Sequence, residues 1–154
     1  MEPDERDAFR IGQFAKELVT IRLGTLEDPS AEAAALVRET ARVALKSRPE
    51  EADCVIADAC CGALQALLLA GLDLSRAASL MLSAVQELAV ALKRDPAELS
   101  GYALEGFARM RRLMRQDQLI DMLDTLESRH PGAGPAFAKA LALQPDPSRR
   151  LPVG

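Results

Sequence analysis

The stretch that decides the fold of this 154-residue chain is ADCVIADACCGALQALLLAGL, residues 52–72. Its apolar residues fall on every side of a helical wheel, a pattern typical of an enclosed core helix. A helix over residues 49–70 would be about 33 Å long at 1.5 Å per residue. A membrane span needs roughly 20 predominantly apolar residues, and Asp53, Asp58 and Gln65 interrupt this one. The stretch therefore predicts a central, buried helix and no membrane span.

Composition extends this prediction to the whole chain. Apolar residues make up 49% of it, yet there are one Tyr, four Phe and no Trp, so Ala and Leu must form most of the core. Ala and Leu favour helices, and the residues that favour strands are scarce. The length fits one domain with a sizeable core. We expect an all-α bundle of five to six helices around the central helix, with a single domain over residues 1–143. Residues 144–154, where prolines recur, are predicted to be a disordered tail.

Capping residues mark where the other helices begin. An amphipathic helix is expected over residues 4–23. Asp28-Pro29 begins a second helix, which ends before Pro49 because the residue preceding a proline avoids helical geometry. Asp73 begins a fourth helix. Asp95-Pro-Ala-Glu98 begins a fifth and has the spacing of a capping box, with Asp in place of Ser or Thr.

The end of the fifth helix is less sharply marked. Its apolar phase slips at residues 115–118 and then resumes with Leu119 and Ile120. This slip predicts a kink or break there, with a sixth helix beginning near Asp117. Residues 135–143 allow a short final helix.

Charge and cysteine content limit the environment and the partners. The net charge of −4 argues against a general nucleic-acid binder, although local patches are still compatible with one. The first seven residues are mostly acidic, and no apolar signal-peptide region follows them. The three cysteines, an odd number, all lie in the apolar stretch and form no disulfide framework. A reducing, cytoplasmic location is the simplest interpretation.

Nucleophilic catalysis and zinc binding have little support. A Cys–His pair needs a thiolate beside an imidazole, but Cys54, Cys60 and Cys61 lie in the most apolar segment and the single histidine, His130, is distant in sequence. Burial among apolar groups raises a thiol pKa and makes the thiol inert. We interpret the cysteines as structural and expect no cofactor.

An alternative interpretation concerns carboxylates, because Glu39, Glu50, Glu51 and Asp53 belong to two consecutive helices and could hold Mg²⁺. The run Glu50-x-x-Asp53, with the apolar helix and Asp73 after it, resembles the all-α nucleotide pyrophosphohydrolases. Those enzymes bind Mg²⁺ and a nucleoside triphosphate through paired E-x-x-E and E-x-x-D motifs. The first motif is missing here. Acidic residues in a first helical turn also offset the helix dipole, and we favour that interpretation.

A second alternative is DNA binding. Residues 86–100, with Gln86-Glu-Leu-Ala89, Leu92 and Asp95-Pro-Ala-Glu-Leu-Ser100, resemble the two central helices of helix-turn-helix regulators of the phage-repressor type. Lys93 stands where that family usually has Gly. The corresponding recognition helix would present Glu98, Gly101, Tyr102 and Glu105, an acidic face that repels phosphates. We favour an ordinary helical hairpin.

A basic cluster is the remaining unusual feature. Arg109, Arg111, Arg112 and Arg115 lie within seven residues with no acidic residue among them. On a continuous helix they would span a broad arc opposite Met110, Leu113 and Met114. Such a cluster serves either as a solvated face or as a docking site for an acidic partner.

The leading hypothesis is therefore a non-enzymatic helical interaction protein, such as an adaptor, assembly factor or inhibitor-like binder. We expect its partner to be another protein, with an acidic surface that contacts the four arginines. We also expect a homodimer, because the fourth and fifth helices carry more apolar residues than one central helix can cover. These residues are Leu80, Met81, Leu82, Val85, Val90, Leu104, Met110, Leu113 and Met114.

Overall fold

The computed structural model describes residues 28–144, and this part of the chain is built from α-helices and short 3-10 helices without a strand. The prediction of an all-α bundle is thus confirmed. The helix expected over residues 4–23 and nearly all of the predicted C-terminal tail lie outside the described residues. The elements are α2 (Pro29–Ser47), η2 (Pro49–Glu51), α3 (Ala52–Leu69), α4 (Leu74–Ala91), α5 (Pro96–Ala108), η3 (Arg109–Arg112), α6 (Gln116–Arg129) and α7 (Ala133–Ala142).

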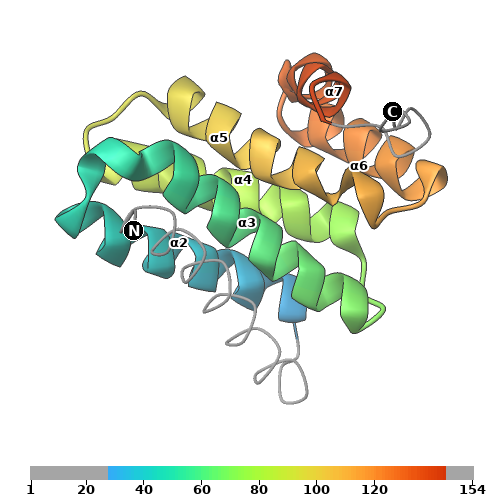
Figure 1. Cartoon of the computed structure of the whole chain (residues 1–154), viewed down its shortest axis with the longest axis horizontal. Helices are drawn as coiled ribbons and strands as arrows, with labels where there is room; N and C mark the ends of the chain where they lie inside the picture. Colours follow the sequence, from blue (N-terminus) through green and yellow to red (C-terminus); the bar gives the residue numbers. More distant parts are fainter. Residues whose placement is uncertain (1–27, 145–154) are drawn as a thin grey trace, which may run out of the picture.

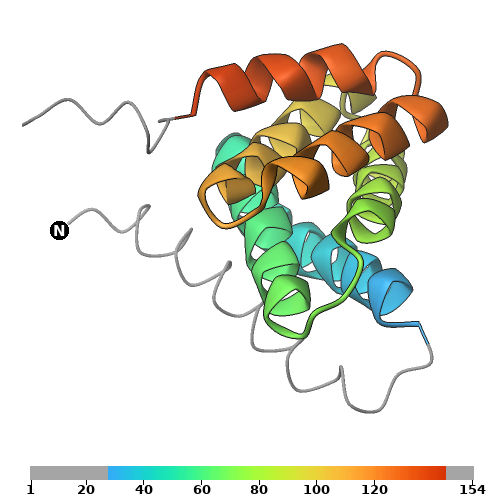
Figure 2. The same cartoon turned by 90° about the vertical axis from the view of Figure 1, so that its right-hand side faces the viewer.

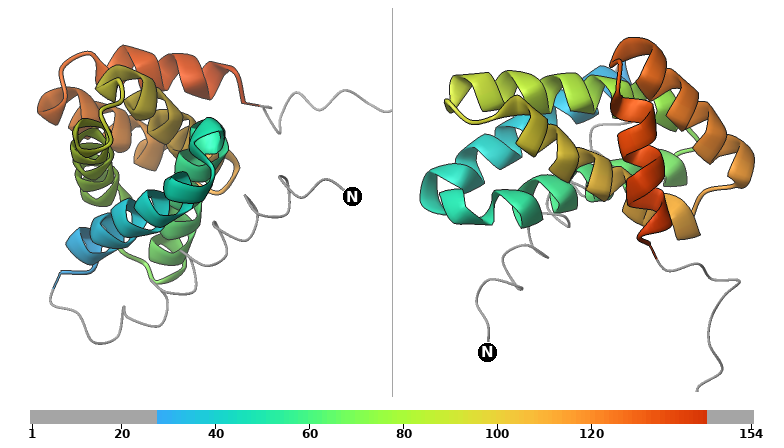
Figure 3. Two further views of the ribbon diagram at one scale, coloured as in Figure 1. Left: turned by 90° about the vertical axis from the view of Figure 1, so that its left-hand side faces the viewer. Right: turned by 90° about the horizontal axis from the view of Figure 1, so that it is seen from above.

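Four of these helices form a ring (Figure 1). Helix α2 packs against α3 and α4, and α5 packs against the same two helices from the other side. Helices α3 and α5 run in the same direction, antiparallel to α2 and α4. The hairpin of α6 and α7 lies on the α4–α5 side of the ring, with α6 against α4 and α7 against α5 (Figure 2). This placement leaves α3 on the side of the ring away from the hairpin (Figure 3).

The predicted apolar helix is present as η2 followed by α3. It is the one candidate for a membrane span among the described residues, by length and composition, and 61% of the candidate window is buried inside the protein. Its largest fully buried side chains are Ile56, Leu64 and Leu67. It thus contributes a substantial part of the core, as the sequence predicts.

Aspartate side chains begin three of the helices, as predicted. The carboxylates of Asp28, Asp73 and Asp95 accept hydrogen bonds from backbone N–H groups at 3.2, 3.0 and 3.0 Å, respectively. The capping box predicted at Asp95 is only half formed. Its Glu98 carboxylate is instead bonded to Arg94 and Tyr102, because these partners lie within reach in the folded chain.

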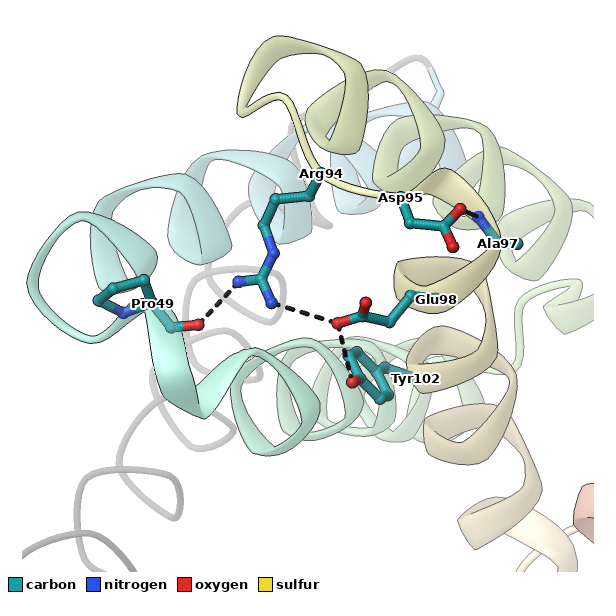
Figure 4. A network of polar contacts seen from close by, with 6 residues as sticks. All are labelled: Pro49, Arg94, Asp95, Ala97, Glu98 and Tyr102. Atoms are coloured by element: carbon teal, nitrogen blue, oxygen red, sulfur yellow. Dashed lines mark hydrogen bonds and ion pairs between the residues drawn. The ribbon is translucent and has the colours of Figure 1, made fainter.

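The same glutamate belongs to a polar network that joins two turns at one end of the ring (Figure 4). The Arg94 guanidinium donates to the Pro49 carbonyl at 2.7 Å and to Glu98 at 3.2 Å, and the Tyr102 hydroxyl donates to Glu98 at 3.0 Å. Arg94 follows α4, whereas Pro49 begins η2. The network therefore fastens the α2–α3 turn to the α4–α5 turn.

Two helices end in the same hydrogen-bonding pattern but with different residues. After α3, Leu72 N–H donates to Leu67 and Gly71 N–H donates to Leu68, with φ of +73° at Gly71. After α4, Arg94 and Lys93 make the equivalent bonds to Ala89 and Val90. Lys93 has φ of +58°, in the left-handed region that costs L-residues roughly 1–2 kcal/mol. This pattern is the Schellman motif, which prefers glycine at the left-handed position.

Replacing Lys93 by Gly should therefore stabilise the protein. We expect Lys93→Gly to raise the free energy of unfolding by about 0.5–1 kcal/mol, since relief of the backbone strain exceeds the extra entropy of glycine in the unfolded chain. Urea unfolding measures the change. Gly71→Ala, at the matching position after α3, should act in the opposite direction. A destabilised Lys93→Gly protein would contradict this account of the turn.

The ion pair of Asp28 with Arg76 predicts a dependence of stability on pH. Arg76 donates to the Asp28 carboxylate at 2.5 and 2.8 Å. These bonds, with that from Ala31, lower the pKa of Asp28 from 3.8 to about 2. A carboxylate with a lowered folded-state pKa stabilises the fold above its unfolded pKa and loses this effect as pH falls. Asp28→Asn should thus lose less stability than the wild type between about pH 5 and pH 2.

Urea unfolding at a series of pH values measures this difference. The variant Arg76→Gln removes the partner instead and should reduce the acid sensitivity in the same way. If Asp28→Asn and the wild type lose stability in parallel, the ion pair contributes nothing to the acid response.

Helices α3 and α5 approach closely at one point. A Cβ atom added to Gly106 would lie 2.5 Å from the Ala57 carbonyl oxygen and 2.9 Å from the Ala57 Cα. Both atoms belong to the α3 backbone and cannot rotate away. Glycine at position 106 is therefore required for the two parallel helices to pack at this distance.

The fifth helix ends earlier than predicted. Helix α5 stops at Ala108, residues 109–112 form a 3-10 turn, and α6 begins at Gln116. The break expected at residues 115–118 thus spans residues 109–115, although the start of α6 lies close to the predicted position. Met110 and Met114 are buried across the break, which explains why the apolar spacing of a helix continues through it.

Candidate interaction surface

The four arginines of the basic cluster do not form the helical stripe that the sequence predicts. The stripe required a continuous helix, whereas residues 109–112 form a 3-10 turn and Arg115 is the N-cap of α6. Two of the arginines bond within the chain to other elements. Arg109 pairs with Asp58 on α3 at 2.7 Å, and Arg111 donates to the Leu141 carbonyl on α7 at 2.9 Å. These two side chains therefore attach the α5–α6 connection to the rest of the fold.

The other two arginines are more available to a partner. Arg112 is exposed. Arg115 is exposed too, and its guanidinium pairs with Asp117 at 3.1 Å. Such a pair on the surface contributes little to stability and can exchange for a partner's carboxylate. Leu113, between them in sequence, has 56% of its surface exposed.

A shallow apolar groove lies between α6 and α7. It has a volume of about 280 Å³. Its polar residues are Arg111 and Gln116, and Ile120, 53% exposed, is one of its apolar residues. The full lining is Arg111, Gln116, Leu119, Ile120, Leu123, Ala138, Leu141 and Ala142. We call this feature the α6–α7 groove. A groove of this kind, apolar with a cationic residue in its lining, suits an amphipathic segment that carries a carboxylate.

A single carboxylate, that of Glu127, holds the turn between α6 and α7 through hydrogen bonds. The Glu127 side chain accepts hydrogen bonds from the backbone N–H groups of Gly132 and Gly134, with the shortest at 2.8 Å. These bonds lower the pKa of Glu127. Gly132 has φ of +93°, and a Cβ atom on Gly134 would lie 2.9 Å from the Glu127 Cβ. The hairpin is thus fixed at its turn, and the groove lies toward the other end of the same two helices.

His130 is structural in this arrangement. Its Nε2 atom lies 3.1 Å from the Ser79 carbonyl oxygen, and because a carbonyl only accepts, Nε2 must carry the proton. The hydroxyls of Ser79 and Ser83 are each 3.4 Å from the same nitrogen. A protonated Nε2 cannot take a proton from either serine. The contact therefore fixes the end of α6 to α4 and does not form a Ser–His nucleophile.

The cysteines do not form a reactive site either. Burial raises the pKa of the Cys60 and Cys61 thiols, and a smaller degree of burial raises the pKa of Cys54. A raised pKa leaves little thiolate at neutral pH. The interpretation of the cysteines as buried structural residues agrees with the position of Cys60 and with the half-buried position of Cys61. It is wrong for Cys54, which is exposed near the start of α3.

The carboxylates of the alternative Mg²⁺ interpretation are not brought together. Glu39 is bonded to Arg42 along the outside of α2, and Glu51 pairs with Arg48. Glu50 and Asp53 are exposed. Across residues 28–144, no three His, Cys, Asp or Glu side chains gather closely enough to hold a metal ion. The geometry thus gives the pyrophosphohydrolase resemblance no support.

For the helix-turn-helix alternative, the backbone of the turn fits, but the exposed side of the would-be recognition helix does not. Lys93 adopts the left-handed conformation that suits the glycine usually found at that turn. Helix α5, however, packs against α3, α4 and α7, and its exposed residues include Glu98, Gly101 and Glu105. The side left free for DNA is therefore acidic.

Most of the apolar residues on which the homodimer prediction rests are buried within the same chain. Of the nine residues concerned, Met81, Leu82, Val85, Leu104, Met110 and Met114 are buried. Leu80 is half-buried, and Val90 and Leu113 are 69% and 56% exposed. Of the residues behind the homodimer prediction, Val90 and Leu113 are thus the ones left largely exposed for a second copy of the chain, and the homodimer stays a prediction.

Neither the α6–α7 groove nor the turn held by Glu127 was recognised from the sequence. The groove depends on which faces of two short helices meet. The sequence signal for it is Ile120, an apolar residue of α6 that does not belong to the buried set Leu119, Met122 and Leu126. The chain matches no protein-family model, no curated protein and no solved structure.

Proposed function

We propose that this protein is a non-enzymatic interaction protein whose α6–α7 groove binds an acidic, amphipathic segment of another protein. The observation that carries the proposal is an apolar groove with Ile120 exposed in it and the Arg111 side chain in its lining. The apolar side chains of the partner would pack on Ile120 and Leu123. Arg112 and Arg115, exposed on the connection that leads into α6, would attract its carboxylates.

The charges and the apolar groove have separate roles in this proposal. Exposed charges chiefly increase the rate of association and are screened by salt. Apolar anchors buried at the centre of an interface determine how slowly the complex dissociates, because they carry most of the binding energy.

The test is affinity capture from an extract of the source organism, followed by titration of the purified partner. Ile120→Asp should weaken binding at least about tenfold, because the complex would bury a carboxylate among apolar groups. Arg112→Glu with Arg115→Glu should slow association and reduce its dependence on salt. Val90→Asp, on the exposed side of α4, is the matched control because Val90 is also largely exposed, at 69%.

A partner retained by Val90→Asp and lost by Ile120→Asp supports the proposal. Cross-linking should place an acidic segment of that partner against α6 or α7. A partner that binds both variants equally would contradict the proposal, because it would use another surface.

A further inference from the structure

One stripe of α3 is left open by the described residues. Eleven residues of this helix are buried, but Cys54 and Leu69 are exposed and Cys61, Gln65 and Leu68 are half-buried. Together with Asp58, four of them follow a spacing of three or four positions (54, 58, 61, 65 and 68), and Leu69 directly follows Leu68, so the five lie along one side of the helix. We call them the α3 stripe. Asp58 lies on the same side, and its charge is paired with Arg109.

The exposure of the α3 stripe is unusual for such a helix. Leu69 has 75% of its surface exposed at the end of the most apolar helix in the chain. Helices α2 and α5 flank α3, and the α6–α7 hairpin packs on the opposite side of the ring. A fifth helix laid along the stripe would enclose α3 on all sides, as its composition predicts.

The sequence contains one segment suited to this position. Residues 4–23 are predicted to form an amphipathic helix, and at about 100° per residue Ile11, Phe14, Leu18 and Ile21 share one side. Gln13, Lys16 and Thr20 share the opposite side, on which Phe9 also falls near the start of the segment. A helix of 20 residues is about 30 Å long and α3, with 18 residues, about 27 Å. The two lengths match.

The chain also reaches the stripe without strain. Helices α2 and α3 are antiparallel neighbours, so the start of α2 lies at the same end of the ring as Leu69. Asp28 is fixed there by its bonds to Arg76, near the start of α4. The four residues from 24 to 27 can span up to about 14 Å when extended, more than the 8–10 Å between the axes of packed helices.

From this placement we infer that residues 4–23 of the same chain pack as a helix along the α3 stripe and complete the enclosure of α3. The predicted helix would run parallel to α3, with its last turn beside Leu69. This inference concerns a different surface from the α6–α7 groove and does not depend on the proposed function.

Cysteine alkylation of the full-length protein tests the inference. Cys54 and Cys61 belong to the stripe, while Cys60 is fully buried in the core and serves as an internal reference. We expect both stripe cysteines to react slowly in the wild type. The double variant Ile11→Asp with Leu18→Asp should raise their rates about tenfold. A rise of this size corresponds to about ten wild-type molecules with the segment packed on the stripe for each one with it released. The rate at Cys60 should not change.

The matched control is Gln13→Asp with Thr20→Asp, which introduces the same charges at the same spacing on the opposite side of the predicted helix. This control should leave all three rates unchanged. Equal rates in the wild type and in both double variants would overturn the inference. A tenfold rise with the control variant as well would also overturn it, since the effect would then not depend on the apolar side.

A second variant changes the α3 stripe and leaves the sequence of residues 4–23 unchanged. Leu69→Asp places a charge on the stripe at an exposed position, so the core should remain folded. Trypsin should then cleave after Arg10, Lys16 and Arg22 several times faster than in the wild type. Val90→Asp, at a similarly exposed position on α4, should have no such effect. Unchanged cleavage in Leu69→Asp would overturn the inference even if the alkylation variants failed to fold.

Repeating the alkylation at several protein concentrations shows whether the same chain or a second copy covers the α3 stripe. Protection by the same chain is independent of concentration, so it should persist at protein concentrations where sedimentation shows only the monomer. Protection that appears only with dimer formation would assign the stripe to a second copy of the chain and would overturn the inference as stated.

Discussion

Gly106→Ala should lower the free energy of unfolding by about 3 kcal/mol, the cost of overpacking a tight contact. The added methyl group would lie 2.5 Å from the Ala57 carbonyl oxygen, well inside van der Waals contact. Because this neighbour is backbone, α3 and α5 must separate or bend. Alanine is a better helix former than glycine by up to about 1 kcal/mol, and this gain only partly offsets the clash.

The same helix offers a matched control. Gly101 lies five residues earlier on α5, about 1.4 turns, and a Cβ atom there would meet nothing within 4 Å. Gly101→Ala should therefore stabilise the protein by up to about 1 kcal/mol. Urea unfolding of the two variants separates packing from helix propensity. Equal stabilities would show that α3 and α5 are not in close contact.

Phe137→Ala should detach α7 from the bundle. Phe137 is fully buried and is the one large side chain among the buried residues of α7, the others being Ala133 and Gly134. Truncating a buried Phe to Ala costs about 3–5 kcal/mol. A helix of 10 residues is too short to be stable alone in water. We therefore expect local opening of α7 before the rest of the protein unfolds.

Hydrogen exchange read by mass spectrometry measures this opening. The amides of α7 should lose most of their protection in Phe137→Ala, while those of α3 and α4 should keep theirs. The partner proposed for the α6–α7 groove should also be lost, because α7 forms one wall of the groove. Lys139→Ala, at an exposed position on the same helix, should change neither property. An even loss of protection across all helices would show that α7 is part of a single cooperative core.

Local sequence signals predicted the beginnings of the helices well. The Asp-Pro pairs at Asp28 and Asp95 act through bonds within three residues, so their effect is readable without the fold. The break after α5 was misplaced because it depends on distant partners. Arg109 is bonded to Asp58 and Arg111 to Leu141, and neither contact leaves a pattern in the neighbouring sequence.

The candidate site depends even more on contacts between residues that are distant in the sequence. Composition identified a basic cluster, but periodicity placed all four arginines on one helix. In the structure, two of them bond to α3 and α7, and the α6–α7 groove was not predicted at all. A shallow groove is made by the relative placement of helices, which hydrophobic periodicity does not encode. The uncovered side of α3 could not be predicted for the same reason.

The parallel arrangement of α3 and α5 has a consequence during synthesis. Adjacent antiparallel helices can pair as soon as both exist, but the side of α3 that faces α5 must wait until α4 and α5 have been made. From the end of α3 at Leu69 to the end of α5 at Ala108, the ribosome adds about 40 residues, which takes roughly 2–8 s at 5–20 residues per second. For that interval the most apolar helix of the nascent chain has no partner on that side, and a chaperone could bind it there.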